Sequence, residues 1–157
     1  MSRARYIRSA VALALLAAAF AAPAATHRVD DTGSVVLAPN VQMRWDSPLP
    51  GGGAGSGVTG VLDVALRLNV AAWRGRVGRI YMSLPASPSG SLNVAWTAQG
   101  RLLSGQLRAG ERGLVYSGLI PDAALEDRLR LTLHTDGQRL QRAETLNFTF
   151  EIDLDES

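Results

Sequence analysis

The chain has 157 residues, no cysteine, and 16 basic residues that are all arginine and stand against 14 acidic ones. The lack of cysteine excludes disulfides, a cysteine nucleophile and a thiolate metal site. This length is sufficient for one domain whose hydrophobic core needs no covalent staple.

Residues 1–24 are predicted to be a signal peptide. Three arginines before position 9 precede an apolar run over 10–22, which is too short to span a bilayer. Small residues mark cleavage sites after Ala21 and Ala24, and we expect the second to be used. The mature chain then keeps 13 arginines and all 14 acidic residues. We therefore expect an exported chain with no membrane span, whose nearly balanced charge does not attract nucleic acid.

Residues 25–46 are predicted to form a separate N-terminal segment. Its first part, up to Ser34, is polar and is expected to be mobile. Beyond it, apolar side chains recur at every second position with Pro39 as the only break: Val35, Leu37, Val41, Met43 and Trp45. This period is that of a β-strand, and the proline favours an edge strand or a bulge. We therefore expect one strand that presents these five side chains on a single face.

Residues 47–60 are predicted to be a flexible linker, because they contain two prolines and six glycines without apolar periodicity. Residues 61–157 are predicted to hold the domain. Short alternating segments separated by glycine turns favour an all-β, immunoglobulin-like two-sheet sandwich of about seven strands, with a small closed barrel as the alternative. Asp136-Gly137 indicates a hairpin, and only residues 121–127 look helical.

The clearest strand signal lies near the C-terminal end of the sequence. Apolar side chains alternate there without interruption: Leu146, Phe148, Phe150, Ile152 and Leu154. The acidic residues between them, including Glu151 and Asp153, are expected to form a solvated face. Such a strand must enter a sheet of its own domain or pair with a partner.

No residue pattern indicates catalysis, and we expect no enzyme, metal or cofactor. His134 and Asp136 could form a metal pair, but no third ligand is evident, and we interpret His134 as a surface histidine. No serine lies in a G-x-S-x-G elbow. One basic cluster could hold a small or polyanionic ligand: Trp73, Arg74, Arg76 and Arg79. We favour the interpretation of a basic turn balanced by the acidic C-terminal region, because the total charge is nearly neutral.

Taken together, the layout resembles the structural subunits of chaperone–usher fimbriae, in particular the alternative type without cysteine. The matching features are the signal peptide, the alternating segment over 35–45, the glycine- and proline-rich spacer, the all-β domain and the alternating strand over 146–154. The soft spacer is longer than expected for that family. The resemblance covers the mature chain in layout only, and no single motif is diagnostic.

The resemblance implies a sandwich that lacks one strand and is completed by donor-strand exchange. Val35, Leu37, Val41, Met43 and Trp45 would then be donated to a neighbouring subunit, and Leu146, Phe148, Phe150 and Ile152 would line the acceptor groove. The implied partners are a periplasmic chaperone, an usher and other subunits, and the implied location is the periplasm followed by the cell surface, in an adhesion-related fibre. Two alternatives stay open: a sandwich that is complete by itself, and a monomeric exported module that binds a small or polyanionic ligand.

Overall fold

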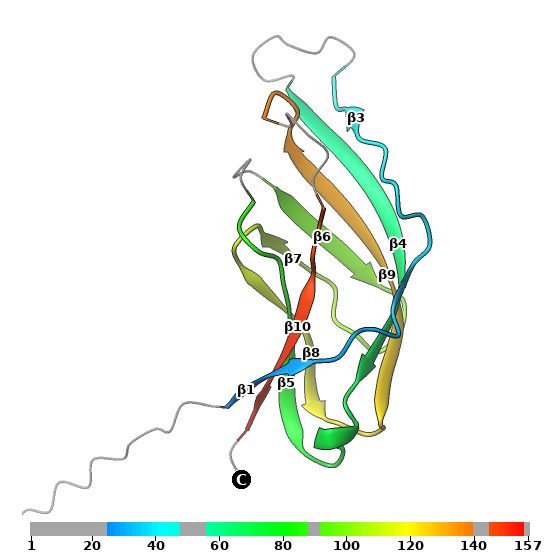
Figure 1. The fold of residues 1–157 in the computed structure, drawn as a ribbon, viewed down its shortest axis with the longest axis vertical. Helices are drawn as coiled ribbons and strands as arrows, with labels where there is room; N and C mark the ends of the chain where they lie inside the picture. Colours follow the sequence, from blue (N-terminus) through cyan, green and yellow to red (C-terminus); the bar gives the residue numbers. More distant parts are fainter. Residues whose placement is uncertain (1–24, 48–55, 88–91, 140–144, 156–157) are drawn as a thin grey trace, which may run out of the picture.

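The computed structural model describes residues 25–47, 56–87, 92–139 and 145–155, which form two antiparallel β-sheets packed face to face (Figure 1). The predicted two-sheet β-sandwich is confirmed. Within these ranges there is no α-helix, and one 3₁₀ turn, η2, spans Ala71–Trp73. The strands are β1 (Thr26–Val29), β2 (Val35–Val36), β3 (Arg44–Trp45), β4 (Gly57–Asn69), β5 (Val77–Ser83), β6 (Asn93–Ala98), β7 (Gly105–Arg108), β8 (Arg112–Leu119), β9 (Ala124–Asp136) and β10 (Thr149–Leu154).

The strand order resembles that of an immunoglobulin-like sandwich, with β7 and β8 as additional edge strands and one substitution. The larger sheet runs β2-β4-β9-β6-β7, with β3 also paired to β4, and its first four strands have the order A-B-E-D of a constant-type domain. The four-stranded sheet runs β1-β10-β5-β8, so that β5 and β10 take the places of strands C and F. The place of strand G, next to F, is taken by β1, which comes from the opposite end of the chain.

The core lies between the two sheets and follows the period-two patterns of the long strands. The larger sheet contributes inward side chains such as Leu66 and Leu131, and the smaller sheet contributes Ile80 and Ile152. Burial in β9 alternates along its length because every second side chain points inward. Removal of this apolar surface from water is the main stabilising contribution to the fold.

Two predicted boundaries differ from the observed ones. The polar stretch from Thr26 to Ser34 is not a free segment, because β1 pairs with β10 and Val29 is fully buried. β4 begins at Gly57, so residues 57–60 belong to a strand and not to the predicted linker. The remainder of that linker lies almost entirely outside the described residues, as does the predicted signal peptide. Pairing with β9 explains the longer strand, since Gly57 lies opposite Asp136.

Two local predictions near β9 are wrong. No helical turn forms over 121–127, because β9 starts at Ala124 and places Leu125 in the core opposite Leu68. Asp136-Gly137 turns the chain but does not join two paired strands, because β9 and β10 belong to different sheets. In both cases pairing with a distant strand overrides the local turn signal.

Candidate functional site on the open side of the sandwich

One side of the sandwich is closed by the chain itself, which passes directly from β7 in one sheet to β8 in the other. The connecting turn is held to the end of β5 by a hydrogen bond from the Gly110 amide to the Leu84 carbonyl, 2.8 Å long. Trp96, which is only 3% exposed, fills the space behind this turn. Its ring lies so close to Gly105 and Gly113 that a Cβ atom at either position would clash with it.

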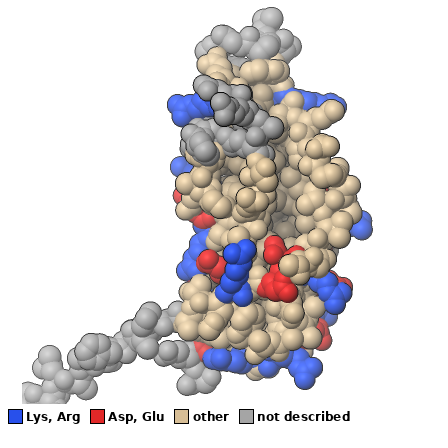
Figure 2. Space-filling model, viewed as in Figure 1, with Lys and Arg blue, Asp and Glu red and all other residues tan. Residues whose placement is uncertain are grey.

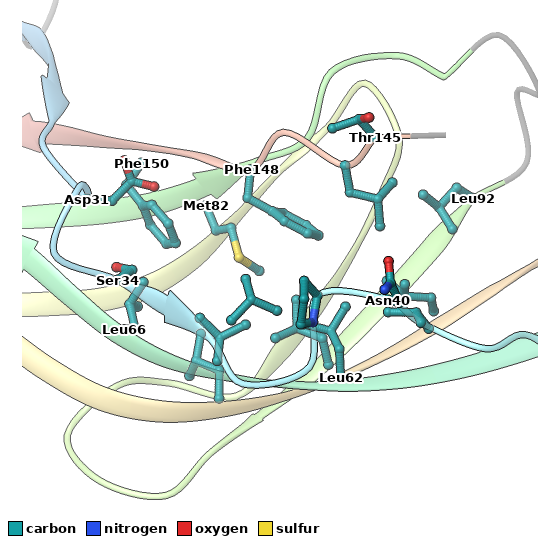
Figure 3. Close-up of a pocket in the computed structure, with 18 of the residues that line it drawn as sticks. Asp31, Ser34, Asn40, Leu62, Leu66, Met82, Leu92, Thr145, Phe148 and Phe150 are labelled. Carbon is teal, nitrogen blue, oxygen red and sulfur yellow. The ribbon is translucent and has the colours of Figure 1, made fainter. Parts of the chain in front are cut away.

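The opposite side contains a cavity of about 700 Å³ between the two sheets. Figure 3 shows Phe148, Phe150 and Met82 pointing into it from the four-stranded sheet and the residues before β10, with Leu62 and Leu66 facing them. The remaining apolar lining comes from both sheets and from the N-terminal part of the chain: Val36, Val41, Met43, Val64, Leu92, Leu129, Leu131, Leu133 and Leu146. A cavity of this size and composition suits an apolar ligand or inserted side chains.

The first wall of the cavity is residues 31–46, which we call the strap. The strap leaves β1 and follows the edge of β4 up to β3 (Figure 1). Its lower end is fixed where Ser34 Oγ accepts a hydrogen bond from the Arg67 amide (2.9 Å) and donates one to the Arg67 carbonyl (3.2 Å). In its middle, Val41 and Met43 cover Gly60, where a Cβ atom would clash with both side chains. The missing side chain of Gly60 therefore leaves the space into which Val41 and Met43 of the strap pack, and we call this space the Gly60 socket.

Asp46 fixes the upper end of the strap. Its amide donates to the Gly57 carbonyl (2.9 Å), its Oδ1 accepts from Thr59 Oγ1 (2.6 Å), and its Oδ2 lies 3.0 Å from His134 Nε2. His134 thus contacts Asp46, and the metal pair with Asp136 that the sequence left open is not formed. Across the described ranges, no group of three histidine or acidic side chains gathers in a way that could hold a metal ion.

The second wall is the edge of the four-stranded sheet at β10. β1 pairs with this edge over 150–153 only, in four antiparallel residue pairs. At Asp30 the chain leaves the sheet and forms a bridge with Asn69 of β4. Residues 145–148 precede β10, which begins at Thr149, and within the described ranges they are not part of a strand. The backbone there borders the cavity beside the half-buried Leu146 and Phe148.

Polar side chains stand at the two ends of the cavity. Figure 3 shows Asp31 and Ser34 at one end and Asn40 and Thr145 at the other. Figure 2 shows acidic and basic side chains together on the lower part of this face, and mainly uncharged described residues in the middle of its upper part, with basic side chains at both margins. The arrangement is an apolar groove with polar mouths.

The five predicted donor-strand side chains do not share one face. Val41 and Met43 pack against the core as an inward pair, whereas Val35 (57% exposed) and Leu37 (53% exposed) point to the outer surface, and Trp45 is half exposed against Gly137. The reversal occurs across bends over 37–40 around Pro39, which interrupt the period-two pattern. Sequence reasoning therefore missed Val36, which borders the cavity although it is 45% exposed.

The predicted terminal-strand side chains do share one face. Leu146, Phe148 and Phe150 line the cavity, and Ile152 is buried beside β1. The prediction of a solvated acidic face is wrong for Asp153, which is 9% exposed.

Asp153 is bonded on both sides. Thr26 Oγ1 donates to its Oδ1 (2.7 Å), and the Arg112 guanidinium, stacked over Tyr81, lies 3.0 Å from its Oδ2. Desolvation is the largest single influence and raises the pKa of Asp153. The hydrogen bonds from Thr26 and Arg112, together with the positive charges of Arg112 and Arg79, outweigh it, so the pKa lies below the usual range.

The predicted basic ligand patch does not form a single site. Trp73 is half-buried against the core, with its ring centroid 5.8 Å from that of His27. Arg79 forms an ion pair with Asp155 at 2.6 Å. Arg74 and Arg76 remain exposed on the turn before β5 and do not line the cavity. The functional geometry of the described chain therefore points to the groove.

Comparison with protein-family models gives no match, and comparison with curated proteins gives none either. Within the described residues, no helix has the length and apolar character needed to cross a membrane.

Proposed function

We propose that this protein is an exported structural subunit that assembles by accepting a β-strand from another chain into the groove between the strap and β10. The observation that carries the proposal is the place of strand G. It is filled by β1 only over 150–153, and residues 145–148, which lead into β10 without forming a strand, border an apolar cavity. This arrangement supports the resemblance to chaperone–usher fimbrial subunits.

The physical basis is strand addition. A strand that continued upward from β1 would run antiparallel to β10 and could form backbone hydrogen bonds with 145–149. Side chains opposite Leu146 and Phe148 would then enter the cavity, because directly opposite residues of an antiparallel pair point to the same face. The partner is therefore an extended segment with bulky apolar side chains at every second position.

A second copy of this chain carries such a segment over 35–45. In one straight strand, its five predicted donor side chains would lie on one face, although in this structure the bends around Pro39 separate them. A contact in which each copy gives a strand to the next is heterologous and builds an open filament. The proposal includes a periplasmic chaperone and an usher as partners, because an open apolar edge needs protection before assembly.

A second candidate function is the binding of a small apolar molecule in the same cavity. It is favoured by the volume of about 700 Å³, which is typical of small-molecule sites, and by the polar side chains at both ends. A polyanionic ligand has less support, because Arg79 is paired with Asp155 and the other arginines lie outside the groove. A bound strand would protect the backbone amides of 145–149 from hydrogen exchange, whereas a small molecule would not.

The first prediction tests strand acceptance with the chain 25–157 and a labelled synthetic peptide of residues 33–46. We expect saturable binding by fluorescence anisotropy, together with slower amide exchange over 145–149. Leu146→Asp should weaken binding by about tenfold or more, because it places a charge in the groove.

Val61→Asp is the matched control, because Val61 lies on the outer face of β4 and is 52% exposed. It should leave the affinity unchanged. The proposal fails if the peptide does not bind, or if both substitutions weaken binding equally while circular dichroism shows folded protein.

A further inference from the structure

The strap is attached to β4 at three places that differ in chemistry. At its lower end a serine hydroxyl exchanges hydrogen bonds with the backbone of β4, and in its middle two apolar side chains pack over Gly60. Neither of these contacts involves a group that titrates near neutral pH. At the upper end Asp46 contacts His134. The upper end is therefore the place where a change of pH can alter how the strap is held.

The position of Asp46 against His134 is fixed by the sheet around it. The Asp46 amide donates to the Gly57 carbonyl (2.9 Å), and its Oδ1 accepts from Thr59 Oγ1 (2.6 Å). Thr59 and His134 are directly opposite residues of β4 and β9, so their side chains lie on the same face. A Cβ atom at Gly57 would lie 2.6 Å from Asp46 Oδ2 and 3.0 Å from His134 Nε2. The glycine therefore leaves the space that the pair occupies.

The strength of this contact depends on the charge of the imidazole. An ionised carboxylate only accepts hydrogen bonds, so His134 Nε2 carries the proton that is donated to Asp46 Oδ2. A second proton on the ring adds the attraction between opposite charges. Histidine gains that proton between about pH 8 and pH 5. The contact is therefore strongest at mildly acidic pH, and it weakens again below about pH 4, where carboxylates become protonated.

Charged groups on the neighbouring elements also act on His134. They are Arg44 on β3, Asp136 on β9, and Arg108 and Glu111, which share a second, smaller hollow with His134 over β6 and β7. The residues directly opposite His134 on β4 and β6 are Thr59 and Asn93, which are uncharged. Because two of the four charged groups are basic and two are acidic, their effects on the charge of the imidazole largely offset one another. The contact with Asp46 at 3.0 Å is therefore the main electrostatic influence.

We propose that Asp46 and His134 form a pH-sensitive latch, which holds the upper end of the strap at mildly acidic pH and loosens it as the pH rises. Val41 and Met43 lie a few residues before this end and line the cavity. Loosening of the latch therefore frees the wall that they form. This inference rests on the proposed function, in which residues 35–45 leave their own domain, and it adds the contact that controls their release.

Hydrogen exchange at the Asp46 amide reports on the latch, because this amide is bonded to the Gly57 carbonyl and exchanges when the end of the strap opens. NMR gives its protection factor, the intrinsic exchange rate divided by the observed rate, which removes the pH dependence of the exchange chemistry. The side chains of His134 and Asp46 are 52% and 40% exposed, so the change is modest. For the chain 25–157 we expect protection about two- to fivefold higher at about pH 5.5 than at about pH 8.

Substitutions of the two histidines separate the latch from general effects of pH. His134→Gln keeps a hydrogen-bond donor without a charge, and the Asp46 amide should then have the lower protection at both pH values. His134→Lys keeps a positive charge throughout this range and should give the higher protection at both. His27→Gln is the matched control, because His27 is the other histidine of the chain and lies beside Trp73 on β1. It should leave the wild-type pH dependence unchanged.

The latch is disproved if wild-type protection at Asp46 is the same at both pH values, or if His134→Gln keeps the pH dependence. It is also disproved if the amide of Leu131, in the middle of β9, changes by the same factor, since the whole domain would then respond. Binding of the peptide of residues 33–46 tests the proposed function separately. Peptide binding without pH-dependent protection rules out the latch alone, and pH-dependent protection without peptide binding rules out the proposed function alone.

Discussion

The two sides of this sandwich are built from similar apolar residues but are covered in different ways. On the closed side, a continuous turn joins β7 to β8, and Trp96 fills the space behind it. On the open side, the strands that the described residues place along the edges of β4 and β10 are β1 and the two short strands of the strap. The difference shows that the closed side is filled by a large buried side chain, Trp96, whereas the open side keeps an apolar cavity between the sheets.

The comparison also separates the parts that hold the fold together from the parts that can move. Removal of contacts on the closed side should destabilise the whole domain, because Trp96 belongs to the buried core. Removal of contacts on the open side should mainly change how the strap and β1 are held, because many of their side chains are exposed. The following predictions test this division.

The largest effect is expected for Trp96→Ala, which should lower the free energy of unfolding by about 3–5 kcal/mol. The substitution leaves a large void between Gly105 and Gly113 and removes the hydrogen bond from Trp96 Nε1 to the Leu103 carbonyl (2.8 Å). Urea unfolding followed by circular dichroism measures it. Trp45→Ala, on the half-exposed strap residue, is the matched control and should cost about 1 kcal/mol or less. Equal losses would contradict the division into a rigid and a movable side.

A smaller loss, about 1–3 kcal/mol, is expected for Gly113→Ala. The added methyl group would clash with the Trp96 ring, which is buried and cannot move aside. Gly60→Ala also creates a clash, but with Met43 and Val41 of the strap, which are only half-buried. We therefore expect a smaller loss of stability and faster amide exchange at the ends of the strap. The opposite order in thermal unfolding would show that the strap is the more rigid element.

The smallest loss of stability is expected for a substitution at Asp153, which accepts a hydrogen bond from Thr26 of β1. Asp153→Asn keeps an acceptor for Thr26 but loses the charge that pairs with Arg112, which should cost about 1 kcal/mol near neutral pH because Arg112 is largely exposed. A folded-state pKa below the unfolded value stabilises the protein above the unfolded pKa, and this contribution is lost as the pH falls through the folded one. The difference in the free energy of unfolding between wild type and Asp153→Asn should therefore become smaller below about pH 4.

Urea unfolding of wild type and Asp153→Asn, from neutral pH to below about pH 4, measures this difference in the free energy of unfolding. Asp122→Asn, in the exposed pair with Arg101, is the control and should show little difference at any pH. A gap that grows on acidification would mean that Asp153 is not held as its contacts indicate.

Strands with an uninterrupted period of two could be predicted well from the sequence. The inward face of Phe150 and Ile152 in β10 was predicted correctly, because alternation along one strand depends only on neighbouring residues. Leu146 and Phe148 line the cavity but precede β10, so the predicted strand starts too early. The strap could not be predicted in the same way. The bends around Pro39 change which side chains face inward, and the Gly60 socket becomes apparent only when residues 41–43 lie across β4.

The all-β class and the core faces of the long strands follow from local alternation, and for that reason the sequence alone was sufficient to establish them. The place of β1 beside β10, the turn that closes one side and the cavity on the other follow from contacts between residues far apart in the chain. Thr26 and Asp153 meet only in the folded protein. The open edge is therefore a property of the tertiary structure, because strand pairing decides which backbone groups are left without a partner.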